Sequence, residues 1–480
     1  MAQPALSHDR KGLKPAAPPA EPLLPPGQRV TMATGASFHD GHLAISPEPL
    51  RIAKLNAPSM AEVEQWLKGG SVGASPQSQR LAVHLLRLGI VIDGPPSTQQ
   101  HLSDITVVIP VHNDDVGLPA LLNYCERFQV SVIIVDDGSS PALDVSRFAP
   151  RANVIRHEQA LGPAAARNSG FAAAATPWVL FVDSDVDVQD FDLGQFSVWC
   201  ERDDVALVAP RVKGHVGTSL RERFDECSGP LDLGREPGRI GARKSIPFVP
   251  SAVMLLRRNA VDIPFDETLK IGEDVDLAWR LDEAGWTLLY RPEHVVAHRT
   301  RARWSSWMLQ RYRYASSAAA LATRHEEAAA PLRGSAVSIG AWVALMSGSP
   351  ITALSLFTSA KRRLEDSLEH LDDQAATARI FAKAVIEPGP RLARQLIRTY
   401  GPGLLLGALV SKRIRRFCMV AMMCGGLERW WRSERNLDPP RYVAISTLDD
   451  LSYAIGLSAG AIQSRSLKAL TPRLTWRAKR

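Results

Sequence analysis

Two carboxylates spaced two residues apart, Asp183 and Asp185, follow directly after the apolar run 178–182. Such a run is typical of a buried strand, and open α/β sheets bind ligands at the carboxyl ends of their strands. Carboxylate oxygens suit Mg²⁺ or Mn²⁺, which bring substrate phosphates as further ligands. The pattern predicts a divalent metal held against a nucleotide diphosphate. For an isolated pair of aspartates, an acidic turn without a metal is the simpler interpretation. The surrounding residues therefore decide between a metal site and such a turn.

Other candidate residues precede this pair. Asp136 and Asp137 follow the apolar run 130–135, and a carboxylate there can accept hydrogen bonds from a uracil or a ribose. Gly138 permits the tight turn that comes next. Arg167 precedes the predicted strand 178–182 by about ten residues. Three roles are open to it: a fixed cation near a nucleotide, an exposed charge on a helix, or an ion-pair partner of Asp136.

Downstream, Glu273 and Asp274 begin a predicted helix, where acidic residues are also common caps. A carboxylate within reach of an acceptor hydroxyl can take its proton. The run 286–296 is a further predicted strand, and His298 follows it. A neutral imidazole at that point is a plausible metal ligand, although a lone histidine is more often structural or solvated.

The elements that position these residues read as an α/β unit. The runs 105–113 and 130–140 are predicted strands, and apolar residues recur at helical spacing between them, over 116–128. This β-α-β pattern predicts parallel strands. A turn at 161–170 then leads into an Ala-rich helix. The sequence therefore predicts that the candidate carboxylates lie together at one edge of a sheet.

Five segments together resemble the family 2 glycosyltransferases, which have the GT-A fold. They are Val107–Asn113, Val135–Ser139, Arg167-Asn168, Asp183-Ser184-Asp185 and Gly272-Glu273-Asp274. The resemblance covers about 103–320 and implies an α/β catalytic domain of the nucleotide-diphospho-sugar transferase type. A sugar nucleotidyltransferase would instead carry a Gly-rich phosphate loop after its first strand, and Pro110–Asn113 is no such loop.

The resemblance implies roles for individual residues. Asp136 would contact the nucleobase, Asp183 would lie on the ribose side, and Asp185 would ligate Mn²⁺ or Mg²⁺, with His298 completing the metal or diphosphate site. Asp274, beside Glu273, would be the general base. Other nucleotide-binding positions are Pro110, Val111, Asn113 and Arg167. One base and one metal suggest a single displacement with inversion, from a UDP-sugar donor. A degenerate, non-enzymatic scaffold would lack one of these carboxylates.

The segment 310–314 resembles the Gln-x-x-Arg-Trp motif of processive family members. Gln310, Arg313 and Tyr314 would then bind the acceptor, with Tyr314 in place of the tryptophan that stacks on the acceptor sugar. This implies several additions in succession. A cluster of Arg and Tyr residues on an interfacial helix is the equal alternative.

Composition sets limits on partners and compartment. The chain has 480 residues, 45% of them apolar, and a net charge of +7, which suits phosphate-bearing substrates or an anionic membrane. No nucleic-acid motif accompanies this charge, so nucleic acid is not an expected partner. Five cysteines without a Cys-x-x-Cys pair favour reduced thiols and a cytoplasmic location.

The sequence before the catalytic domain divides in two. Residues 1–28 are rich in Pro and Ala and are predicted to be a disordered tail. Residues 29–100 are predicted to form a small winged-helix-like module, with a hairpin over 29–46, a helix opened by the capping box Ser59–Glu62 and another opened at Ser75. Such a module could hold a peptide along a strand edge, or simply pack on the catalytic domain.

The C-terminal region, 321–480, is predicted to be helical, basic and membrane-associating. The segment 334–360 has no charged residue and is either a single span or a helical hairpin broken near 348–350. The apolar pieces 401–410 and 417–427 flank the basic 412–416. Short apolar helices with basic flanks are typical of a membrane surface, here the cytoplasmic face.

Taken as a whole, the chain resembles family members that glycosylate a peptide-derived redox cofactor precursor. This implies transfer of glucose from UDP-glucose, with β-1,4-linked additions. A cell-wall polysaccharide or glycolipid glycosyltransferase would share the catalytic residues and differ in acceptor, which would then be a lipid or a saccharide.

Overall fold

The computed structural model describes residues 10–19, 24–25, 27–39, 42–47, 50–96, 99–145, 152–299, 303–326, 328–367 and 374–475. Contacts within the chain divide it into two compact units. Unit 1 comprises residues 1–34, 61–212 and 233–299, and unit 2 comprises residues 35–60, 213–232 and 300–480. The predicted nucleotide, metal and base residues fall in unit 1, and the predicted acceptor residues fall in unit 2.

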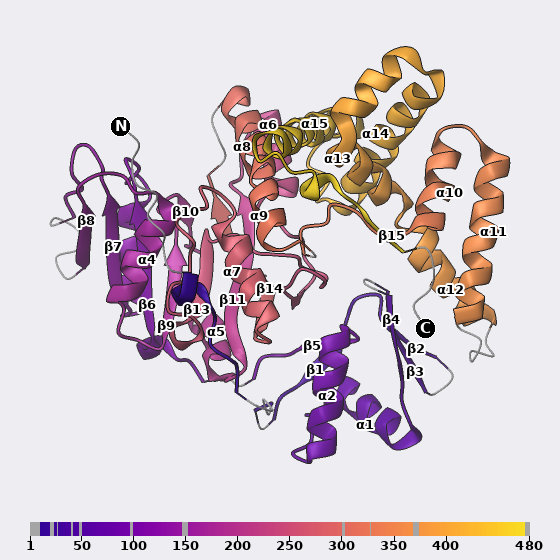
Figure 1. The fold of residues 1–480 in the computed structure, drawn as a ribbon. Coiled ribbons are helices and arrows are strands. Elements are labelled where there is room, and N and C mark those ends of the chain that lie inside the picture. The colour runs from indigo at the N-terminus through magenta and orange to yellow at the C-terminus, as the bar shows by residue number, and fades with distance from the viewer. Residues whose placement is uncertain are drawn as a thin grey trace. The chain divides into compact units, whose positions relative to one another are not determined.

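A nine-stranded sheet forms the centre of unit 1 (Figure 1). Strands β9, β6, β7 and β8 are parallel neighbours in that order, and β13 pairs antiparallel with β9 to begin the second half of the sheet. The strands are β6 Ile105–Val111, β7 Ser131–Asp137, β8 Asn153–His157, β9 Trp178–Val182, β10 Val186–Asp187, β11 Val205–Gly214, β12 Gly238–Arg239, β13 Val253–Arg257 and β14 Thr287–His298.

The predicted parallel β-α-β unit is confirmed. Strand β6 pairs with β7 in a register that sets Val111 opposite Asp136, so the ligand ends of the two strands lie together. Strand β8 was not predicted. Its burial is only partial along its length and its apolar residues are few, so it gives no clear period. It places Arg156 opposite Asp136 on the far side of β7.

Three helices position the site residues in unit 1. They are α3 Leu118–Arg127, α4 Pro163–Ala173 and α7 Glu273–Glu283. On α7, Leu277 and Leu281 are fully buried in the core that also takes in Val108 and Phe181 from the sheet. With this apolar face in the core, the acidic first turn of α7 lies at the sheet's ligand edge.

The segment 29–100 forms more elements than a hairpin and two helices. Strand β1 Val30–Met32 pairs with β5 Val91–Asp93, while β2 Ser37–His39, β3 Leu43–Pro47 and β4 Leu50–Lys54 form a separate antiparallel sheet. The predicted hairpin over 29–46 therefore exists only as β2 and β3, and its turn at 40–41 lies outside the described residues. The winged-helix-like comparison stays a prediction.

The helix starts in this segment differ from each other. Helix α1 begins at Ala57, not at the predicted capping box, because the Asn56 side chain accepts the Ser59 N–H at 2.9 Å. Helix α2 Pro76–Leu88 begins as predicted, with the Ser75 hydroxyl accepting the Ser78 N–H at 3.1 Å. Its last turn ends at Gly89, which adopts a left-handed conformation.

Part of the predicted disordered tail has a defined place in unit 1. The Ala16 N–H donates to the carbonyl of Ala260 at 2.9 Å, and the Trp286 indole N–H donates to the carbonyl of Ala16 at 2.8 Å. The Gly12 carbonyl accepts the Ile263 N–H at 3.0 Å. Residues 12–16 thus satisfy backbone groups of the catalytic domain, which composition alone does not reveal.

Unit 2 consists mostly of helices. These are α6 Leu220–Ser228, α8 Trp304–Ser316, α9 Ala318–Arg324, α10 Ala336–Met346, α11 Pro350–Ser367, α12 Gln374–Phe381, α13 Gly389–Val410, α14 Lys412–Arg432 and α15 Pro439–Gln463. The short parallel strands β15 Arg333–Ser335 and β16 Arg473–Thr475 accompany them. Ion pairs are buried between these helices: Arg311 of α8, which is 1% exposed, pairs with Asp225 of α6 and with Asp449 of α15.

The uncharged segment 334–360 forms a helical hairpin, which confirms one of its two predicted structures. Helix α10 ends at Met346, Gly348 adopts a left-handed φ of 86°, and α11 begins at Pro350. The two later apolar pieces are parts of longer helices rather than separate short ones: 401–410 is the end of α13, and 417–427 is the middle of α14. None of the described helices combines the length and the apolarity that a bilayer span requires.

Candidate active site

Hydrogen bonds join the residues that follow β6 to those that follow β7. The Asn113 N–H donates to the Ser139 hydroxyl at 3.0 Å, and the Asn113 side-chain carbonyl accepts the Ser140 N–H at 2.8 Å. Asn113 itself has a φ of 55°, a left-handed conformation that asparagine tolerates. Pro110 and Val111, which precede it, are the last residues of β6. The predicted nucleotide-binding segment therefore forms a fixed rim beside Asp136.

Asp136 is 1% exposed and lies at the centre of a hydrogen-bond network. Its carboxylate accepts the N–H groups of Ser139 at 2.9 Å and of Leu143 at 3.1 Å, and it pairs with the Arg156 guanidinium. Burial alone would raise the pKa of Asp136, but these hydrogen bonds lower it. Asp136 is therefore a preorganised, ionised acceptor.

The arginine that pairs with Asp136 is Arg156, which sequence reasoning missed. Arg167 had been one candidate for that role, and the structure corrects it. The signal was weak because Arg156 belongs to β8, the strand without a clear period, and because only the register of β7 and β8 brings Arg156 opposite Asp136. No sequence spacing encodes that register.

Asp137 organises the loop that leads to α4. Its carboxylate accepts the N–H groups of Leu161 at 2.9 Å and of Gly162 at 2.8 Å, and it contacts the imidazole of His157 at 2.7 Å. The turn that follows Asp137 requires glycine, since a Cβ on Gly138, at a φ of 68°, would lie 2.4 Å from the backbone nitrogen of Ala160. Asp137 thus supports the start of the helix that carries Arg167.

Arg167 joins two of the predicted acidic sites. Its guanidinium donates to Asp183 at 2.6 Å and to Glu273 at 3.2 Å, and its side chain is only 5% exposed. One cation therefore links the end of β9 to the first turn of α7. Of the three roles open to Arg167, the exposed helix charge is also wrong.

Asp185 and His298 face each other at the edge of the sheet. Strand β10 pairs antiparallel with the end of β14, which sets Val186 opposite His298. The Asp185 carboxylate then lies 3.4 Å from His298 Nε2, and the two side chains are 22% and 15% exposed. The structure therefore brings together the two predicted metal ligands.

These two side chains fit a divalent cation that also binds substrate. A carboxylate oxygen and an imidazole nitrogen are donors that Mn²⁺ accepts, and such ions commonly take one or two protein ligands plus substrate phosphates. Within the described residues, no group of three or more His, Cys, Asp or Glu side chains is arranged to hold a metal. Phosphate oxygens and water would therefore complete the coordination.

Glu273 and Asp274 open α7, after Gly272 at a left-handed φ of 90°. Asp274 accepts the Ser251 N–H at 3.2 Å and the Val275 N–H at 2.8 Å, which fixes its carboxylate. Burial and the neighbouring Asp274 charge raise the pKa of Glu273 to about 7. Burial also raises the pKa of Asp274. Both carboxyl groups are thus closer to proton-transfer range than exposed ones are.

The predicted acceptor residues all lie on α8, in unit 2. The Gln310 amide donates to the Tyr314 hydroxyl at 3.0 Å, and Gln310 also accepts a hydrogen bond from the buried Arg311 at 3.1 Å. Arg313 is exposed. The motif is therefore anchored by Arg311, a residue between the motif positions that sequence reasoning did not single out.

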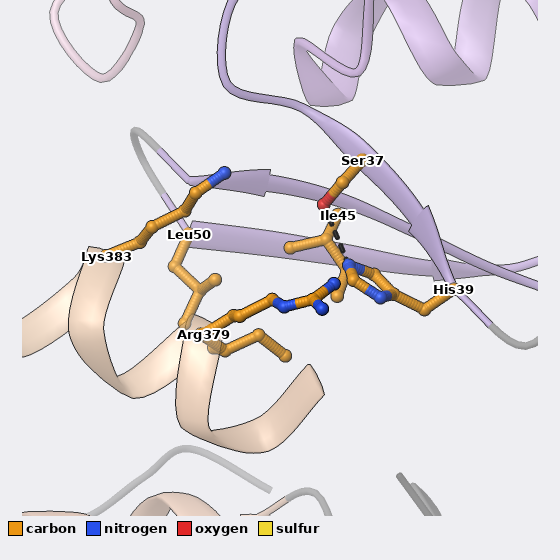
Figure 2. A pocket seen from close by; sticks show the side chains of 7 residues that line it. Ser37, His39, Ile45, Leu50, Arg379 and Lys383 are labelled. Carbon is orange, nitrogen blue, oxygen red and sulfur yellow. Dashed lines mark hydrogen bonds between the residues drawn. The ribbon is translucent and has the colours of Figure 1, made fainter. Parts of the chain in front are cut away.

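A separate cavity of about 150 Å³ lies in unit 2 between the sheet β2–β4 and helix α12 with its extension (Figure 2). Its lining combines polar side chains with apolar ones: Ser37, His39, Ile45, Leu50, Arg379, Ile380 and Lys383. Lys383 donates to the carbonyl of Gly35 at 2.9 Å, and Ser37 contacts His39 at 2.9 Å. None of the predicted site residues lines it.

A GT-A-like sheet whose ligand edge carries this acidic cluster defines the class of protein. Residues 106–263 match the profile of glycosyl transferase family 2. The chain belongs to this family and is a glycosyltransferase, which confirms the predicted fold class and enzyme class.

The chain is similar over nearly its whole length to the pre-mycofactocin glycosyltransferase of Mycobacterium tuberculosis, in two strains. The chain is 34% identical to it over 461 residues, which cover 91% of this chain and 95% of the relative. The succinoglycan biosynthesis protein ExoU of Rhizobium meliloti is 30% identical over 193 residues, 36% of this chain and 56% of that protein. Among solved structures, S. aureus TarS 1-349 is 18% identical with a TM-score of 0.32, covering 68% of this chain and 92% of that chain.

Proposed function

We propose that this enzyme transfers a sugar, glucose, from a UDP donor to a hydroxyl of a peptide-derived cofactor precursor of the mycofactocin type, with inversion. The observation that carries the proposal is the 34% identity to a pre-mycofactocin glycosyltransferase over nearly the whole of both chains. A similarity confined to the catalytic domain would speak only for the family. Here it includes residues on both sides of the catalytic domain as well.

The donor binds at the ends of β6, β7 and β9 in this proposal. The rim of Pro110, Val111 and Asn113 lies beside the nucleobase, which Asp136 contacts. Asp183, held by Arg167 at 2.6 Å, lies on the ribose side. The fixed hydrogen bonds of Asn113 and Asp136 support these roles, because a preorganised site loses less entropy on binding.

Asp185 and His298 hold the divalent metal, Mn²⁺ or Mg²⁺, against the donor diphosphate. The bound metal neutralises charge on the leaving diphosphate. The two side chains would supply a carboxylate oxygen and an imidazole nitrogen, and substrate oxygens and water would complete the coordination. Their partial exposure, 22% and 15%, supports a site that opens toward a ligand.

Asp274 is the general base. It takes the proton of the acceptor hydroxyl while that oxygen bonds to the anomeric carbon, and the bond from this carbon to the diphosphate oxygen breaks, releasing UDP. A single displacement inverts the anomeric configuration, so an α-linked donor gives a β-linked product. The N–H groups of Ser251 and Val275 orient the Asp274 carboxylate for this step.

Gln310, Arg313 and Tyr314 bind the acceptor. The Tyr314 ring, held by the Gln310 amide at 3.0 Å, offers a face on which a sugar can stack. After the first transfer, the new terminal sugar becomes the next acceptor, which gives several β-1,4 additions. The enzyme acts at the cytoplasmic face of the cell membrane.

A second candidate is a polysaccharide or glycolipid glycosyltransferase. The similarity to two succinoglycan biosynthesis proteins favours it, at 30% and 29% identity. Those alignments cover only 36% and 38% of this chain, so they carry less weight than a similarity over nearly the whole chain.

Product analysis tests the proposal. The full chain is incubated with a panel of UDP-sugars and with peptide-derived, lipid and saccharide acceptors, with Mn²⁺ or Mg²⁺ or with a chelator, and the products are identified by mass spectrometry. We expect hexose additions to the peptide-derived acceptor from UDP-glucose alone, and only with metal. Transfer solely to lipid or saccharide acceptors would contradict the proposed acceptor.

A matched pair of variants tests the metal role. Asp185→Ala should abolish metal-dependent turnover. Asp187→Ala removes an exposed carboxylate two residues away and should leave turnover near that of the wild type. Full activity in Asp185→Ala, or equal loss in both variants, would contradict the role assigned to Asp185.

A further inference from the structure

One end of the helical hairpins in unit 2 exposes large apolar side chains. They lie in the first turns of α11 and the last turns of α13, and we call them the apolar tip: Ile351 is 84% exposed, Leu354 68%, Leu406 69%, Leu409 76% and Val410 89%. Single exposed apolar residues are ordinary on protein surfaces, but a group of this size marks an interaction site.

The two parts of the apolar tip belong to neighbouring turns. Helices α10, α13 and α14 share one apolar core, which includes Met346, Ile397 and Phe417. A Cβ on Gly348, in the turn between α10 and α11, would lie 2.6 Å from the Arg416 guanidinium, in the first turns of α14. The turn from α10 to α11 and the turn from α13 to α14 are therefore at the same end of this helical bundle (Figure 1).

Basic side chains border the apolar tip. Shortly after Val410 come four exposed cations: Lys412, Arg413, Arg415 and Arg416. Within the described part of the chain, none of the four forms an ion pair with a carboxylate. The sequence has no Asp or Glu over 388–427 or over 334–364. The acidic residues of these hairpins, Glu365, Asp366 and Glu428, lie more than ten residues along the chain from the two turns.

We propose that the apolar tip inserts into the surface of an anionic membrane, with the 412–416 cations on lipid phosphates. The side chains of α11 and α13 would reach the boundary between headgroups and acyl chains, which excludes them from water. The basic residues would lie at headgroup depth, where the surface potential attracts them. Insertion of helix ends, rather than a span, agrees with the absence of any described helix able to cross a bilayer.

The cations beside the apolar tip favour an anionic membrane over a second copy of the chain as the binding partner. A second copy of the chain would have to bring its own row of cations against Lys412 and Arg413, which repel it at short range. A phosphate-bearing surface satisfies the cations and covers the apolar side chains at the same time. The proposal is independent of the transfer reaction, because vesicle binding is measured without substrate.

Vesicle flotation with the full chain tests the proposal. The probes are vesicles of phosphatidylcholine alone and of phosphatidylcholine mixed with phosphatidylglycerol. We expect the wild type to float with the mixed vesicles and to remain largely free with phosphatidylcholine alone, and salt should weaken the binding. Equal binding to both vesicle types, or none to either, would overturn the proposal.

Variants separate the two contributions. The triple change Leu406→Ser, Leu409→Ser and Val410→Ser should lower partitioning by about tenfold or more, because it removes most of the apolar area. The double change Lys412→Gln and Arg413→Gln should lower binding to anionic vesicles by about fivefold per residue. Arg415 and Arg416 are kept, since the first donates to the carbonyl of Ala408 and the second packs beside Gly348.

A control variant matches the apolar change at another surface. Val216→Ser with Leu467→Ser removes two side chains that are 72% and 71% exposed outside these hairpins, and flotation should not change. Light scattering of each variant in solution provides the second measurement. If the triple variant changes the oligomeric mass and leaves flotation intact, the apolar tip is an interface between copies and the membrane proposal is wrong.

Discussion

Two regions of unit 1 bury charged side chains, and they differ in how the charges balance. In the candidate active site, Arg167 serves both Asp183 and Glu273, with Asp185 and Asp274 close by. In the second region, which we call the Arg202 network, Asp93 receives the guanidinium groups of Arg202 at 2.6 Å and Arg239 at 3.3 Å, and Arg202 also binds both oxygens of Asp204.

The pKa values follow this balance. Burial raises the pKa of Glu273 to about 7 and also raises that of Asp183. Burial would do the same to Asp93, but the charges of Arg239 and Arg202 hold its pKa well below the ordinary range. Burial is common to both regions, so it does not identify a functional site. An excess of carboxylate groups over nearby cations does point to a functional site, because a bound metal ion or proton lowers the electrostatic free energy of such a site most.

The largest expected difference concerns activity. Asp274→Asn keeps the shape of the side chain but cannot take a proton, so turnover should fall about 10²- to 10⁴-fold. Donor binding and the unfolding temperature should change little, because the carboxylate carries no net stabilising charge pair there. Single-turnover rates, a UDP binding titration and thermal unfolding measure the three quantities.

Asp262→Asn is the control for that change. Asp262 is an exposed carboxylate of the same unit, and its amide variant should keep the wild-type rate. If Asp274→Asn retained a tenth of the activity or more, Asp274 would not be the base.

The Arg202 network should show the reverse behaviour. Arg202 is fully buried, and Arg202→Met leaves Asp204 without its guanidinium partner and Asp93 with Arg239 alone. Removing one partner of a buried ion pair costs about 3–5 kcal/mol, so urea unfolding should show a loss of that order. Activity per folded molecule at low temperature should stay close to that of the wild type.

Arg432→Met is the matched change on the surface. Arg432 is 59% exposed and pairs with Glu428 at 2.6 Å, an i,i+4 pair of the kind worth about 0–1 kcal/mol. A loss in Arg202→Met as small as in Arg432→Met would show that the Arg202 network is not a stabilising element.

The sequence predicted strands β6, β7, β9 and β14 and helices α3, α4 and α7, but it did not predict β11 or β13, which are buried along most of their length. The runs that became β6, β7 and β9 are mostly apolar, as strands covered on both faces are. Strand β8 and the pairing of β1 with β5 were missed for a common reason. Both are short, and their partners are set by tertiary register rather than by a local period.

For the candidate active site, the sequence predicted which residues lie together at the ligand edge of the sheet. It did not predict which side chains form ion pairs or hydrogen bonds with each other. The pairing of Asp185 with His298 depends on the antiparallel contact of β10 and β14, which joins residues far apart in the chain. The sequence did not single out Arg156, and it left three alternative roles open for Arg167. Only the three-dimensional arrangement decides between partners of equal charge.

The smallest expected effect concerns the pH dependence of stability. Glu273 is 7% exposed, and its pKa rises from 4.5 in the unfolded chain to about 7 in the folded one. Between these values the folded state binds more protons than the unfolded state, so stability falls as pH rises. The contribution is fully present below pH 4.5 and is lost as pH rises through about 7.

Glu273→Gln should therefore flatten the stability profile between pH 5 and pH 8, by an amount on the order of 1–3 kcal/mol, as urea unfolding at several pH values would measure. Glu64→Gln, at a side chain 54% exposed, should leave the profile unchanged. In the Arg202 network the sign is opposite, since carboxyl groups with lowered pKa values lose their stabilising effect only as pH falls. Parallel profiles for Glu273→Gln and the wild type would mean that Arg167 fully neutralises Glu273, and the contrast between the two regions would then not hold.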